Sequence, residues 1–159
     1  MAIYWRRKLS GLEAALFAAA CAVILAVFLE RTLAYMELAE RIAMEITVRQ
    51  VNSGLSLWRA TQLLEGSVLE RGQALQTNPF ELARLRVGNA HPDMEDRKML
   101  ERLERRHWVF DRPAQELLYL PQLHRGLETH DSEALVRFHL VMGSDATYAL
   151  VPAAEYSWH

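Results

Sequence analysis

An uncharged, mostly apolar run near the start of the chain limits the possible folds more than any other feature. No side chain from Ala14 to Leu29 is charged. As a helix this run would be roughly 24 Å long, close to the ~30 Å hydrocarbon core of a bilayer. A buried core helix of this kind would need a large domain around it, but the rest of the 159-residue chain is short and rich in charge. The run therefore predicts one membrane-spanning helix, over residues 11–32.

The charges beside this run predict its orientation. Arg6, Arg7 and Lys8 lie before it, in a basic leader over residues 1–10, whereas Glu30 and Arg31 follow it directly. Positive residues favour the cytoplasmic side of a membrane. We therefore expect a single-pass protein with a cytoplasmic N-terminus and most of its chain on the other side.

The sequence after the run predicts that the helix continues, over residues 33–66. The stretch "FLERTLAYMELAERIAMEI" contains no glycine or proline, and it does not resemble the small-residue cleavage site of a secretory signal. Apolar residues recur there at helical spacing, which predicts an amphipathic helix. The expected apolar stripe comprises Leu33, Met36, Leu38, Ile42, Met44 or Glu45, Ile46 and Val48. The small residues 52–54 indicate a cap, a kink, or neither.

Residues 67–106 are expected to be a connector of loops and short helices. In "NPFEL", Asn78 and Pro79 are typical of a turn or of a short helix with proline in its first position. The stretch "MEDRKMLERLERR" predicts a short solvated helix. Acidic and basic residues are interleaved in this stretch, and the formal charge of the chain is only -2. Both observations argue against a nucleic-acid partner.

Residues 107–159 have the pattern of antiparallel strands. "HWVFD", "ELLYLP" and "EALVRFHLVMG" are short runs rich in aromatic and branched residues, and a tight turn is expected over residues 111–115. "TYALVPAAEYSW" predicts an edge strand that Pro152 ends. Such a small sheet needs a cover for its apolar face. The predicted fold class is therefore α+β, a long N-terminal helix, half transmembrane and half amphipathic, packed on a small antiparallel sheet.

The residues that carry catalytic or metal chemistry are scattered. The six histidines and the single Cys21 show no zinc-site spacing, and the serines and glycines form no nucleophile elbow or phosphate loop. One loop, "HRGLETHD", gathers possible ligands, namely His124, Glu128, His130 and Asp131. Since loops are ordinarily polar, we expect no metal in this one. Because no catalytic or phosphate-binding pattern is present either, we expect no enzyme activity, no cofactor and no small-molecule substrate.

Four features in order resemble the type IV pilin and type II secretion pseudopilin superfamily. They are the basic leader ending in Gly11, the apolar helix that becomes amphipathic, "NPFEL" at 78–82, and "HWVFDRPAQELLYLP" at 107–121. The resemblance implies a structural or assembly subunit, or an accessory, of a type IV pilus or a type II secretion pseudopilus. It also implies a bacterial inner-membrane location, with the C-terminal domain in the periplasm or in an extracellular filament. The implied partners are other pilin-like subunits or assembly-platform proteins.

The processing positions that this resemblance implies depart from the family's pattern. Gly11 would be the cleavage glycine and Leu12 the first mature residue, where the family has phenylalanine. Leu16 stands where the family has glutamate, and Glu13 comes three residues too early. One cysteine also cannot form the disulfide of many pilins.

Other functions therefore stay open. Besides the filament subunit, a second possibility is a single-pass membrane scaffold or sensor that never polymerises and has a periplasmic binding domain. A third possibility is a metal-dependent activity in the 124–131 loop.

Overall fold

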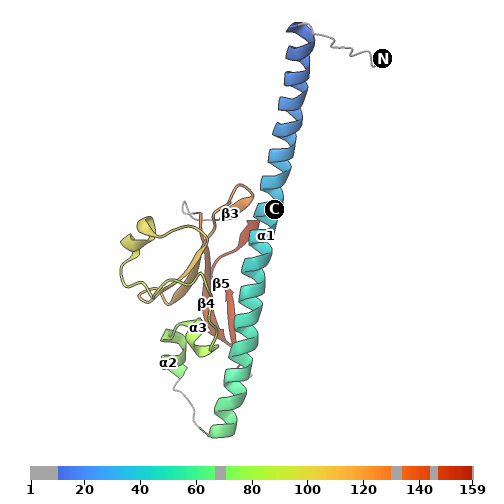
Figure 1. The fold of residues 1–159 in the computed structure, drawn as a ribbon. Coiled ribbons are helices and arrows are strands. Elements are labelled where there is room, and N and C mark those ends of the chain that lie inside the picture. The colour runs from blue at the N-terminus through green and yellow to red at the C-terminus, as the bar shows by residue number, and fades with distance from the viewer. Residues whose placement is uncertain (1–10, 67–70, 130–133, 144–146, 159) are drawn as a thin grey trace. The chain divides into compact units, whose positions relative to one another are not determined.

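The predicted long helix is confirmed in the computed structural model, which describes residues 11–66, 71–129, 134–143 and 147–158. Helix α1 spans Gly11–Glu65 (Figure 1). The chain forms two compact units, one that ends at Met36 and one that begins at Glu37. Below, the N-terminal unit means residues 11–36, and the sheet unit means the described residues from Glu37 onward.

Helix α1 continues without a break through residues 52–54, so these residues form neither a cap nor a kink. They bring the helix close to its neighbours instead. A Cβ atom on Gly54 would lie 2.7 Å from the Cβ of Ala83 and 2.8 Å from its carbonyl oxygen, so a larger residue does not fit. Asn52 forms a double hydrogen bond with Leu150, accepting from its backbone N–H at 2.7 Å and donating to its carbonyl at 3.3 Å.

The sheet contains four antiparallel strands in the order β1-β2-β4-β5. Their bounds are β1 His107–Asp111, β2 Glu116–Leu120, β4 Val136–Met142 and β5 Tyr148–Pro152. The predicted hairpin, third strand and edge strand are thus confirmed, and Pro152 is the last residue of β5. Two short strands, β3 Leu127–Thr129 and β6 Tyr156–Trp158, form a separate antiparallel pair that the sequence analysis did not predict.

Both faces of the β1–β2 hairpin are buried. On one face Trp108, Phe110, Leu117 and Tyr119 pack in a cluster that includes Met44, Val51 and Leu55 of α1. On the other face Val109 and Leu118 pack with Met94, Leu100 and Leu103. Because side chains alternate across a strand, the two faces need two covers. The helix provides one, as expected, and the charge-dense segment around residues 94–103 provides the other.

The face of α1 that packs on the sheet differs from the predicted stripe. The buried residues of α1 are Glu37, Glu40, Met44, Val51 and Leu55. Of the predicted stripe, Met44 is buried and Val48 is partly buried, but Leu38, Ile42 and Ile46 are about half exposed. The prediction failed because it assumed an apolar contact, whereas two carboxylates occupy this face and accept hydrogen bonds from the sheet unit.

The connector contains three short helical elements. They are α2 Arg71–Gln76, α3 Pro79–Leu82 and a 3₁₀ helix, η1, Arg97–Arg102. The short solvated helix is therefore present in the 3₁₀ form, with no fully buried residue. Between α3 and η1, His91 and Met94 donate backbone hydrogen bonds to β1 residues Trp108 and Phe110, which covers the β1 edge of the sheet.

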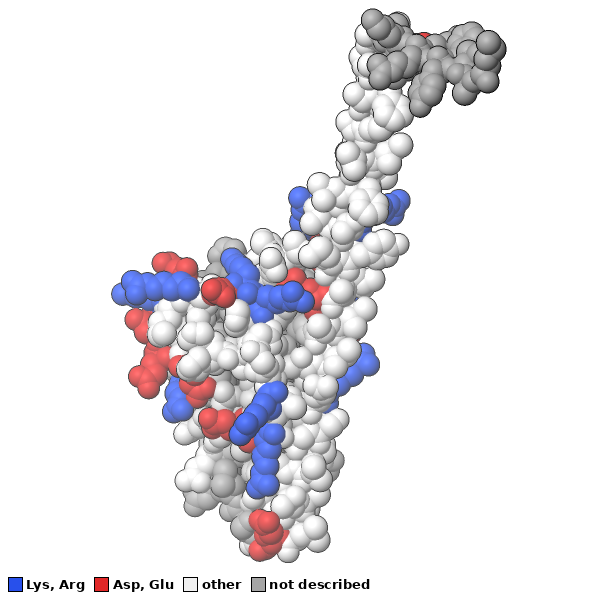
Figure 2. Space-filling view, viewed as in Figure 1, with Lys and Arg blue, Asp and Glu red and all other residues white. Residues whose placement is uncertain are grey.

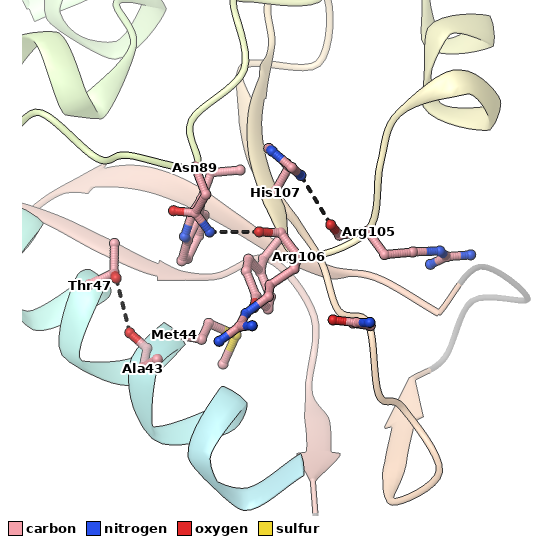
Figure 3. A pocket seen from close by; sticks show the side chains of 10 residues that line it. Ala43, Met44, Thr47, Asn89, Arg105, Arg106 and His107 are labelled. Carbon is pink, nitrogen blue, oxygen red and sulfur yellow. Dashed lines mark hydrogen bonds between the residues drawn. The ribbon is translucent and has the colours of Figure 1, made fainter. Parts of the chain in front are cut away.

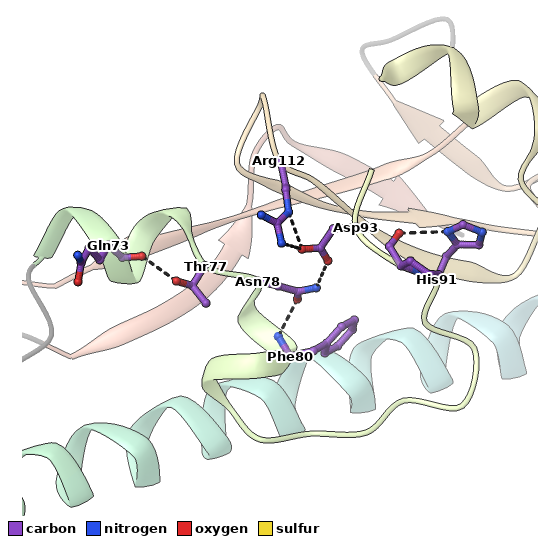
Figure 4. Close-up of polar contacts among 8 residues, drawn as sticks. Gln73, Thr77, Asn78, Phe80, His91, Asp93 and Arg112 are labelled. Atoms are coloured by element: carbon purple, nitrogen blue, oxygen red, sulfur yellow. Dashed lines mark hydrogen bonds and ion pairs between the residues drawn. The ribbon is translucent and has the colours of Figure 1, made fainter. Parts of the chain in front are cut away.

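The sequence left a turn or a short helix open for "NPFEL", and the structure has the short helix, α3, with Asn78 as its N-cap. Its side chain accepts a hydrogen bond from the Phe80 N–H at 3.0 Å and donates one to Asp93 at 2.6 Å (Figure 4). Asp93 also forms an ion pair with Arg112 at 2.9 Å. These contacts hold Phe80 where its ring meets Trp108 edge-on, with 5.8 Å between ring centroids. The two quoted segments, at 78–82 and 107–121, therefore meet in one core.

Candidate functional site

The positions implied for processing lie in the first turns of α1. The helix begins at Gly11, and a Cβ atom there would meet nothing within 4 Å. Leu12 and Leu16 are 72% and 63% exposed, and Glu13 is exposed in the first turn. A glutamate there is favourably placed, because helix N-termini attract negative charge. The basic leader, residues 1–10, lies outside the described residues.

The N-terminal unit presents an apolar surface. From Leu12 to Leu29 its large apolar side chains are more than half exposed, and one 18-residue window has a mean hydropathy of 2.5 with none of its residues buried. No side chain from Ala14 to Leu29 is charged, and Figure 2 shows a white stretch of the helix there. Apolar surface of this extent is unfavourable in water. Within the part of the chain that the structure describes, α1 is the one helix long and apolar enough to cross a membrane.

Two buried carboxylates attach α1 to the rest of the sheet unit. Glu40 accepts three hydrogen bonds, from the Tyr119 hydroxyl at 2.9 Å and from the backbone N–H groups of Gln122 at 2.7 Å and Leu123 at 3.1 Å. The segment after β2 is thereby held on the helix. Burial, and then the charge and hydrogen bond of Glu40, raise the pKa of Tyr119 well above its usual value, so this phenol remains a donor.

Glu37, one turn earlier in α1, makes the second attachment between the helix and the rest of the sheet unit. Its carboxylate accepts from the backbone N–H of Gly126 at 2.8 Å and from the indole N–H of Trp158 at 3.0 Å. The guanidinium of Arg41 donates to the main-chain carbonyl of Trp158. The β3–β6 pair is therefore fixed to α1 by charged side chains. No signal in the sequence analysis found this role, because carboxylates on an amphipathic helix are ordinarily assigned to its solvent face.

A cleft of about 510 Å³ opens beside this attachment. Its walls come from α1, from Asn89, and from the start of β1, and they include the side chains of Arg106 and Met44. Figure 3 shows Arg106 extending toward Met44 while Arg105 points away from it. No aspartate or glutamate is among the ten residues that line the cleft. No pattern in the sequence predicted this cleft.

Arg106 is held in an uncommon backbone conformation at the rim of the cleft. Its φ is +68°, a region that residues other than glycine seldom occupy. Its N–H donates to the carbonyl of Leu120 at 2.5 Å, and its own carbonyl accepts from the side chain of Asn89 at 2.6 Å. The backbone of this arginine is therefore anchored on both sides, which fixes the direction in which its side chain leaves the chain.

The loop that gathers possible metal ligands, residues 124–131, is only partly within the described residues. His124 and Glu128 are described, whereas His130 and Asp131 are not. Among the described residues, no group of three histidine, cysteine, aspartate or glutamate side chains is placed to hold a metal ion. The ring nitrogens Nδ1 of His91 and His107 lie at hydrogen-bond distance from the backbone carbonyls of Pro92 and Arg105. These two histidines therefore have local structural contacts.

Comparison with known proteins gives no relative. No protein-family model matches the chain, and neither the curated proteins nor the solved structures include a significant match to it.

Proposed function

We propose that this protein is a pilin-like subunit or accessory of a type IV pilus or a type II secretion pseudopilus, anchored in the inner membrane of a bacterium. Its N-terminus would be cytoplasmic and its sheet unit periplasmic, or displayed outward from a filament. It would act by lateral packing of α1 against α1 of other pilin-like subunits, or against assembly-platform proteins.

One observation carries this proposal: α1 has exposed apolar side chains in both units. In the N-terminal unit all large apolar residues between Leu12 and Leu29 are more than half exposed. In the sheet unit, where the helix already has a packing partner, Leu38, Ile42 and Ile46 are still about half exposed. These three lie four residues apart, on one face of the helix. A membrane accounts for the first set, and a second packing partner accounts for both.

Small residues support close packing of this helix. The apolar run contains Ala14, Ala15, Ala18, Ala19, Ala20 and Ala22. Small side chains let helix backbones approach closely, which is a usual route to association in lipid. Alanine is also common in membrane helices, so this composition supports the proposal without carrying it.

A second candidate is a single-pass scaffold or sensor that does not polymerise. It is favoured by Leu16, which stands where a filament subunit of the family would have glutamate. N-terminal mass analysis of the full-length protein, extracted from membranes, separates the two. A mature chain that begins at Leu12 supports prepilin processing, and an intact Met1 removes the ordinary pilin route and favours the permanent anchor.

Cysteine crosslinking in membranes tests the packing itself. In a Cys21→Ser background, Ile42→Cys places a thiol on the exposed face of α1, and Glu81→Cys is the matched control on the exposed surface of α3. We expect oxidation to give disulfide-linked species with Ile42→Cys and not with Glu81→Cys. Equal yields from both positions, or none from Ile42→Cys, would contradict lateral packing through this face.

A further inference from the structure

We draw no further inference here: the strongest candidate, the exposed face of α1 that carries Leu38, Ile42 and Ile46 in the sheet unit, is the packing surface already proposed above, and nothing in the structure shows which partner covers it.

Discussion

Replacing Glu40 should destabilise the sheet unit more than any substitution on the exposed surface. The side chain is only 5% exposed and accepts three hydrogen bonds. A hydrogen bond to a charged group contributes about 1.5 kcal/mol or more, and donors left buried without a partner cost a similar amount each. Glu40→Leu removes all three acceptors at once, so we expect it to lower the free energy of unfolding by about 4 kcal/mol. That loss is a large part of the ~5–15 kcal/mol typical of a whole domain.

A conservative variant keeps this prediction testable if Glu40→Leu does not fold. Glu40→Gln retains one acceptor oxygen, which can face the Tyr119 hydroxyl and the Gln122 N–H, so we expect a loss of about 1–2 kcal/mol. Glu81 is exposed on α3, and Glu81→Gln should change stability by less than about 0.5 kcal/mol. The assay is urea unfolding of the full-length protein in a non-ionic detergent, followed by tryptophan fluorescence. The prediction is refuted if the free energies of unfolding of Glu40→Leu and Glu81→Gln differ by less than about 1 kcal/mol.

Two further predictions concern packing and pH. Gly54→Ala should lower the free energy of unfolding by about 1–3 kcal/mol in the same assay, because the new Cβ would collide with Ala83. Gly72→Ala, which has open space around the new Cβ, should be neutral or stabilising. Equal effects of the two variants would contradict the close approach of α1 to Ala83. In the folded protein the pKa of Tyr119 is raised above its unfolded value of about 10. As the pH rises above 10, the unfolded chain therefore releases the Tyr119 proton before the folded protein does. The stability that Tyr119 contributes is complete below pH 10 and is lost as the pH rises further. Tyr119→Phe should remove that alkaline loss, and identical pH profiles of the two proteins from pH 9 to 11 would disprove it.

The elements of the fold were largely predictable because each has a local signal. The uninterrupted helix follows from a glycine- and proline-free sequence after the apolar run, and the β1–β2 hairpin follows from aromatic and branched runs around a tight turn. Asn78 and Pro79 narrowed their segment to a turn or a short helix for the same reason, because capping and fixed backbone angles act within a few residues. The β3–β6 pair was missed, since three-residue strands carry little periodicity.

The buried side of α1 was not predictable in this way. Leu38, Ile42 and Ile46 satisfy helical periodicity as well as Met44 and Val51 do, and nothing local says which face meets the sheet. The choice depends on Glu37 and Glu40, whose partners lie 79 to 121 residues away in the sequence. The cleft beside Arg106 could not be predicted either, because it forms only when α1, Asn89 and β1, which are far apart in the sequence, come together.

The sequence by itself determined that the chain has one long apolar helix, a small antiparallel sheet and no intrachain disulfide, because helix length, strand alternation and cysteine count are local properties. Only the tertiary structure decided which face of the helix is covered, why Gly54 has no side chain, and that Arg106 lies beside a cleft. These features depend on hydrogen bonds and close contacts between residues far apart in the chain. They leave no periodic trace in the sequence, since a carboxylate that binds a backbone N–H looks the same as one that faces water.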